Sequence, residues 1–64
     1  MKLPMRMNAG QTFSTLSLAG IPDSEIRTAM VATHETGLPH PVGTMTLWAG
    51  DGIDYANEWW RITS

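Results

Sequence analysis

The stretch IPDSEIRTAMVATHETG, residues 21–37, decides the fold because it carries the marks of a helix at both ends and along its length. Pro22 or Asp23 opens the helix, and carboxylates in its first turn complement the partial positive charge of a helix start. Gly37 follows the last turn, where a left-handed conformation is needed, and Pro39 prevents continuation. One apolar stripe at helical spacing consists of Ile26, Ala29, Met30 and Thr33.

The segment after this helix predicts a β-hairpin. Residues 42–50, VGTMTLWAG, are rich in β-branched and aromatic side chains, which is typical of a strand. The Asp-Gly pair at 51–52 is a two-residue turn signal, and residues 55–63 return as the partner strand. A helix over residues 53–62 is the alternative, but the turn signal and the β-preference of Trp, Tyr, Ile and Thr favour the strand.

The segment before the helix is ambiguous. Residues 11–20, QTFSTLSLAG, contain Phe and Thr, which favour a strand, and residues 2–7 are expected to pair with it through a turn at 8–10. The predicted order is ββαββ. It gives an α+β fold in one domain, residues 1–64, with an antiparallel sheet of three to four strands and one central helix on one face.

The adjacent residues Trp59 and Trp60 are expected to differ in burial, because neighbouring side chains of a strand point to opposite faces. Trp60 should lie inside, in an apolar set with Met45, Leu47 and Ile62, whereas Trp59 should be at least partly exposed. Glu58 is the one charged residue on the apolar face, so it needs a partner or a place near an end.

The opposite face is predicted to be aromatic and polar. A turn at 51–52 places Trp48 opposite Tyr55. The same register continues with the pairs Thr46 and Asn57, Thr44 and Trp59, and Val42 and Arg61.

One helix covers only one face of a sheet, so this second face is expected to be a contact surface. Trp, Tyr and Arg are the residues most enriched among binding hot spots, and an exposed aromatic patch on a small protein usually marks an interface. The alternatives are an aromatic ladder that only stabilises the hairpin, or a second small core under residues 1–10. The predicted partner-binding residues are Trp48, Tyr55, Trp59, Arg61, Asn57 and Thr44.

Composition limits the function further. The chain has 64 residues and no Cys, so it forms no disulfide or thiolate metal site, and a cytoplasmic location is expected. A chain this short buries only about 60% of its unfolded surface, and a partner chain is the remaining way to add stability. The formal charge of −2 with four dispersed cations disfavours nucleic acid as a partner. Neither a signal peptide nor a membrane span is predicted.

No catalytic or metal-binding motif stands out. His34, Glu35 and His40 match no zinc spacing, and Asp51 with Asp54 lacks the remainder of a calcium loop. No serine lies in a nucleophile motif. We therefore expect neither enzymatic activity nor a cofactor.

The function predicted from these features is that of a non-enzymatic protein-binding module. It would act as a small inhibitor or accessory protein that occupies a surface of a larger protein or complex, and a homodimer is the other expected assembly. Phage-encoded inhibitors of host complexes, anti-CRISPR proteins among them, are similar in size and charge. The analogy extends to no residue motif, and it implies the host cytoplasm as the location.

A DNA-binding regulator is the alternative. Residues 15–30, TLSLAGIPDSEIRTAM, resemble the helix-turn-helix motif of phage repressors, with Gly20 in the turn. The second helix departs from that motif because it contains Glu25 and has Arg27 as its only cation. A recognition helix is expected to offer several donors to bases and phosphates.

Overall fold

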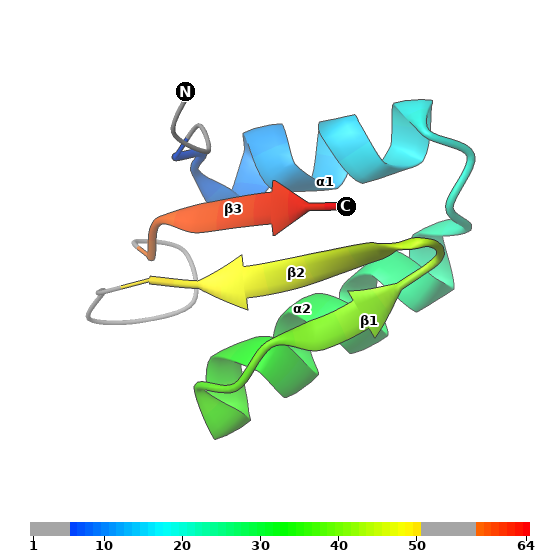
Figure 1. Cartoon of the computed structure of the whole chain (residues 1–64). Helices are drawn as coiled ribbons and strands as arrows, with labels where there is room; N and C mark the ends of the chain where they lie inside the picture. Colours follow the sequence, from blue (N-terminus) through cyan, green and yellow to red (C-terminus); the bar gives the residue numbers. More distant parts are fainter. Residues whose placement is uncertain (1–5, 51–57) are drawn as a thin grey trace.

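The structure is a computed structural model that describes residues 6–50 and 58–64 (Figure 1). The described residues form two helices and then three strands, which pair as an antiparallel sheet in the order β1-β2-β3. This confirms the α+β class, whereas the expectation of one central helix is wrong. The elements are α1 (Ala9–Leu18), α2 (Asp23–Thr36), β1 (His40–Val42), β2 (Met45–Ala49) and β3 (Trp60–Thr63).

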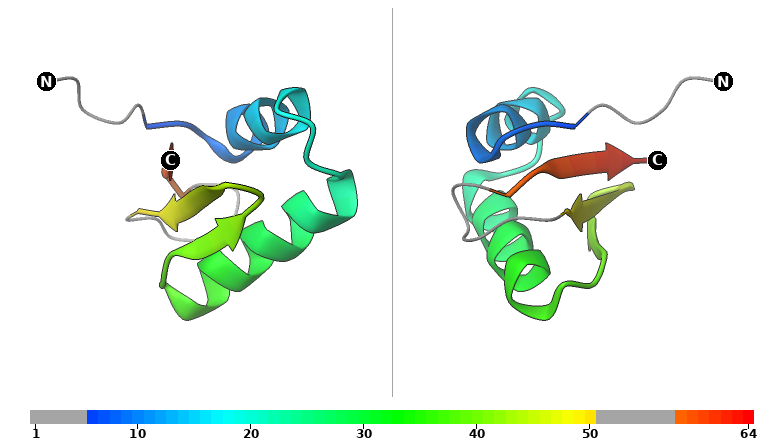
Figure 2. Two further views of the ribbon diagram at one scale, coloured as in Figure 1. Left: turned by 45° about the vertical axis from the view of Figure 1, so that its right-hand side comes forward. Right: turned by 90° about the vertical axis from the view of Figure 1, so that its left-hand side faces the viewer.

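Both helices lie on the same side of the sheet, so the molecule has two layers (Figure 2). α2 packs against β1 and β2, while α1 packs against β3 and α2. The sheet therefore has an inner face, which meets the helices, and an outer face, which no described helix covers. The core between the layers consists of Leu16, Ile26, Ala29, Met30, Val42, Leu47 and Trp60.

α2 follows the prediction at both ends. Pro22 is its N-cap and Gly37 its C-cap, with a left-handed φ of 70° at the glycine. The N–H of Gly37 donates to the carbonyl of Thr33 at 2.9 Å, which closes the last turn. The buried residues of the helix are those of the predicted stripe, Ile26, Ala29, Met30 and Thr33.

α1 corrects the expectation of a strand within the ambiguous segment 11–20. Asn8, which was interpreted as part of a turn, is instead a helix cap. Its side chain accepts the N–H of Gln11 at 2.8 Å, and the Gln11 side chain accepts the N–H of Asn8 at 3.0 Å. This reciprocal capping box satisfies backbone donors that a helix start otherwise leaves unpaired. Thr12 and Leu16, one turn apart, are the buried residues of this helix.

The expected pairing of residues 2–7 with residues 11–20 is also wrong for the part that the structure describes. Met7 forms an antiparallel bridge with Trp60, and both N–H to carbonyl bonds of that bridge are present, at 2.7 and 2.8 Å. Met7 thus lies beside the first residue of β3. Residues 2–5 of the predicted strand lie outside the described residues.

The strand predicted over residues 42–50 is confirmed as β2 over Met45–Ala49, but the predicted strand begins too early, because a tight turn separates Val42 of β1 from β2. Gly43, with φ of 64°, reverses the chain between β1 and β2, and Val42 pairs with Met45. Val42 was expected on the outer face. Because the turn returns the chain on itself, Val42 lies across from Met45 on the inner face, where it is buried.

The pairing of β2 with β3 differs from the predicted register. Trp48 lies opposite Arg61, six residues beyond the predicted partner Tyr55. The N–H of Gly50 donates to the carbonyl of Trp59, and the predicted partner of Gly50, residue 53, lies outside the described residues. The shift is even, so each described side chain of β3 keeps its predicted face. The proposed turn at 51–52 and the residues 55–57 of the predicted strand lie outside the described residues.

Candidate protein-contact surface

The outer face of the sheet gathers a compact set of aromatic, cationic and hydroxyl side chains. Alternation along β2 and β3 places two cross-strand pairs there, Thr46 with Thr63 and Trp48 with Arg61. Trp59 precedes β3 on the same face, and Arg6 reaches it because Met7 pairs with Trp60 on the inner side. We call this set the contact surface; its residues are Arg6, Thr46, Trp48, Trp59, Arg61 and Thr63.

Trp48 is held in one orientation by its neighbours on β3. Its Nε1 donates to Oγ1 of Thr63 at 2.9 Å, so the polar edge of the indole is satisfied within the sheet. The Cζ of Arg61 lies 4.6 Å from the ring centroid, which is a cation–π contact. The ring is half-buried as a result. Trp48 is therefore a fixed aromatic platform with a guanidinium over it.

Trp59 repeats this arrangement in a more exposed form. The Cζ of Arg6 lies 5.2 Å from its ring centroid, and 45% of the residue is exposed. Its neighbour Trp60 is 0% exposed and belongs to the core. The predicted difference in burial between the two adjacent tryptophans is confirmed.

The residue before Trp59 points to the helix layer. Glu58 is buried, and its Oε2 meets Nδ1 of His34 in the last turn of α2 at 2.5 Å. The charged residue predicted on the inner face thus has a partner. The pair joins the last turn of α2 to the residue before Trp59.

The two histidines lie in separate environments. His34 pairs with Glu58, whereas the Nδ1–H of His40 donates to the carbonyl of Pro41 at 2.7 Å. Within residues 6–50 and 58–64, no group of three or more His, Asp and Glu side chains gathers where it could hold a metal ion.

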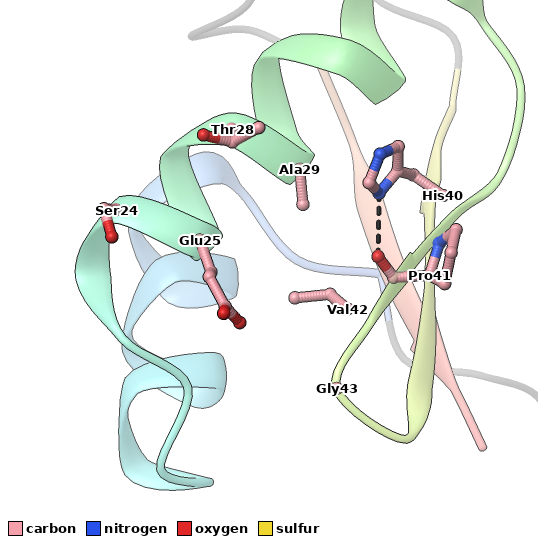
Figure 3. A pocket seen from close by; sticks show the side chains of 8 residues that line it. All are labelled: Ser24, Glu25, Thr28, Ala29, His40, Pro41, Val42 and Gly43. Atoms are coloured by element: carbon pink, nitrogen blue, oxygen red, sulfur yellow. Dashed lines mark hydrogen bonds between the residues drawn. The ribbon is translucent and has the colours of Figure 1, made fainter.

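A cleft of about 280 Å³ lies between the start of α2 and β1 (Figure 3). The Glu25 carboxylate and the Val42 side chain point into it, while His40 stands on the β1 side, bonded to Pro41. Its volume is near the lower limit of ligand pockets. Among the described side chains, no hydrogen bond joins Ser24, Glu25 and His40, so the cleft has no linked nucleophile and base.

The structure brings together three of the predicted partner-binding residues and separates a fourth. Trp48, Trp59 and Arg61 share the contact surface. Thr44 lies in the turn before β2, at the opposite end of that strand from Gly50, so its predicted pairing with Trp59 is wrong. The other two, Tyr55 and Asn57, lie outside the described residues.

Sequence reasoning placed Thr46 on this face without including it among the partner-binding residues, and it missed Arg6 and Thr63. Thr63 follows from the correct register, since it lies across from Thr46. Arg6 has no local signal, because it joins the surface only through the long-range bridge between Met7 and Trp60.

No known protein family matches the sequence, and comparisons with curated proteins and with solved structures likewise give no match. Neither α1 nor α2 in the described part of the chain is long and apolar enough to cross a membrane.

Proposed function

We propose that the protein is a non-enzymatic protein-binding module, a small inhibitor or accessory protein, that covers a surface of a larger protein with its contact surface. One observation carries the proposal. Two indoles with guanidiniums over them stand on the sheet face that neither helix covers, and one of them, Trp59, is 45% exposed. Burying both indoles against a partner would remove this exposed aromatic area from water.

The local geometry suits such a role energetically. Association costs free energy when side chains become ordered at an interface. Trp48 is already oriented by Thr63 and Arg61, so little of that cost remains for this residue. Trp and Arg are also the residue types that most often supply a large share of binding energy.

The test compares two residues of equal exposure on the two layers. Trp59 on the sheet and Val31 on α2 are both 45% exposed. We expect Trp59→Ala to remain folded and to lose capture and cross-linking of its partner from a lysate of the producing cells. Val31→Ala should retain both. The proposed function would be wrong if Trp59→Ala captured the same protein as the wild type with equal yield.

A DNA-binding regulator is the second candidate, favoured by the succession of α1, the connection 19–22 and α2 (Figure 1). The charge of α2 argues against it. Asp23, Glu25 and Glu35 lie on α2, and its only cation, Arg27, has its Cζ 5.6 Å from the Phe13 ring. A regulator would bind duplex DNA with an affinity that falls steeply as salt rises. Anisotropy titrations of a labelled duplex at rising salt, with Arg27→Ala as the variant, distinguish the two functions.

A further inference from the structure

Most charged side chains of the described residues are separated by sign between the two layers, and the exception is Arg27 on α2. The formal charge of the whole chain is −2. Asp23, Glu25 and Glu35 belong to α2 on the helix side, and Glu58 is buried against His34. The contact surface carries Arg6 and Arg61 and no side-chain carboxylate. The described part of this acidic protein thus presents a locally cationic face.

Neither of these guanidiniums is engaged by an acidic group of the described chain. The ion pair within residues 6–50 and 58–64 is that of His34 with Glu58. A guanidinium over a ring keeps its N–H donors in its own plane, so a cation–π contact does not consume them. Arg6 and Arg61 therefore hold donor edges suited to bidentate binding of a carboxylate.

The two cations are also neighbours across the sheet. Arg6 precedes Met7, and Arg61 follows Trp60. Because Met7 and Trp60 form an antiparallel bridge, the two arginines lie opposite each other beside it. Like charges opposite each other on one face destabilise a sheet. An anionic group placed between them would remove that repulsion and receive hydrogen bonds from both.

We propose that the partner of the contact surface is an acidic protein segment, whose carboxylates bind Arg6 and Arg61 while its apolar side chains cover Trp59. This inference rests on the proposed function. A second copy of the chain is disfavoured as the occupant, because a two-fold interface would set each cationic face against an identical one. A nucleic acid is disfavoured because such binding draws on several phosphate contacts, and the described part of this face offers two cations on a chain of net negative charge.

The binding test uses three probes: a short peptide of alternating glutamate and leucine, the same peptide with glutamine for glutamate, and single-stranded oligothymidylate. Binding is followed by Trp fluorescence and by the NMR signals of the Arg Nε–H groups. We expect the acidic peptide alone to bind, more weakly as salt rises. Arg61→Gln and Arg6→Gln should each weaken binding about tenfold, as the loss of a charge-assisted hydrogen bond does. Arg61→Lys, which keeps the charge without the fork, should fall between.

Arg27→Gln is the matched control, since Arg27 makes the same kind of contact with Phe13 on the helix layer. It should leave peptide binding unchanged. The inference is overturned if the acidic peptide does not bind, if the glutamine peptide binds equally, if oligothymidylate binds more tightly, or if Arg27→Gln weakens binding as much as Arg61→Gln.

The same variants separate this inference from the proposed function. If partner capture from the lysate is lost with Trp59→Ala and unchanged with Arg6→Gln and Arg61→Gln, the contact surface stands and the acidic partner is wrong. If all three variants capture the partner like the wild type, the proposed function fails as well.

Discussion

The two faces of the sheet use the same residue type for different purposes. On the inner face Trp60 is 0% exposed and packs with Leu47 and Leu16. On the outer face Trp59, its neighbour in sequence, is 45% exposed under Arg6. The alternation of side chains along an extended chain creates this contrast, and the position of the helices decides which face is closed. Residue type alone therefore does not assign a tryptophan to a core or to a surface.

The largest predicted effect comes from a substitution in the core on the inner face. Trp60→Ala should lower the free energy of unfolding by about 3–5 kcal/mol, because it opens a cavity in a small core. Trp59→Ala should cost about 1 kcal/mol or less, as surface changes generally do. Urea unfolding of both variants, followed by circular dichroism, measures the difference. Equal losses would show that Trp59 is part of the core and that the two faces do not differ.

The next prediction concerns the turn that brings β1 to the inner face. A Cβ at Gly43 would lie 2.6 Å from Cδ1 of Ile21, and the residue has a φ of 64°. At Gly37, φ is 70° and nothing lies within 4 Å of such a Cβ. Gly37→Ala should cost about 1 kcal/mol for the left-handed conformation alone, and Gly43→Ala about 2 kcal/mol because Ile21 must also move.

The double variant Gly43→Ala with Ile21→Val tests the cause, because valine lacks the Cδ1 atom. The excess cost over Gly37→Ala should largely disappear against an Ile21→Val background. An unchanged excess would show that the close approach of the turn to residue 21 is not responsible.

A third prediction tests the contact between His34 of α2 and Glu58, the residue before Trp59. Glu58→Ala should lower stability by about 1–2 kcal/mol, since it removes a buried acceptor and leaves His34 without that partner. Glu58→Gln should cost less, because its amide oxygen still accepts a hydrogen bond. A double-mutant cycle with His34→Ala measures the coupling energy. A coupling energy near zero would mean that the pair contributes nothing to the joining of the two layers.

A fourth prediction concerns α1, which helps to close the inner face beside β3. Asn8→Ala should cost about 1 kcal/mol through loss of the helix cap. Gln11→Ala removes the reciprocal bond and should cost less. Hydrogen exchange of the amides in α1 should rise in both variants. Unchanged exchange would show that packing of Thr12 and Leu16, rather than the cap, holds the start of the helix.

The parts of the fold that sequence predicted are those fixed by local chemistry. α2 carries its own stripe and the Gly37 stop, so its bounds and its buried face were predicted correctly. α1 was not predicted, because the sequence Asn-Ala-Gly at residues 8–10 suits a turn as well as a helix cap. Only the side chain of Gln11, returning to the Asn8 N–H, distinguishes the two.

The candidate surface was predicted in part for a related reason. The alternation of side chains along a strand does not depend on the partner strand. The opposite faces of Trp59 and Trp60 were therefore predicted correctly, although the predicted register differed from the observed one by six residues. The residues that contact the two outer tryptophans were not predicted correctly. The Trp48 ring contacts Arg61, which the predicted register paired with Val42, and the Trp59 ring contacts Arg6, a residue near the N-terminus. Long-range pairing has no signature in a local pattern.

The smallest predicted effect decides how the outer face is interpreted. Arg61 is exposed, and a cation–π contact at an exposed site contributes about 0.5–1 kcal/mol. Arg61→Ala should therefore lower stability by roughly 0.5 kcal/mol, and Arg27→Ala, which loses the contact with Phe13, by a similar amount. If Arg61→Ala instead costs as much as Gly43→Ala, the guanidinium over Trp48 is a structural element of the sheet, and its binding to a partner loses its main support. If the cost is small, the outer face contributes little to the stability of the fold and its side chains are free to serve association.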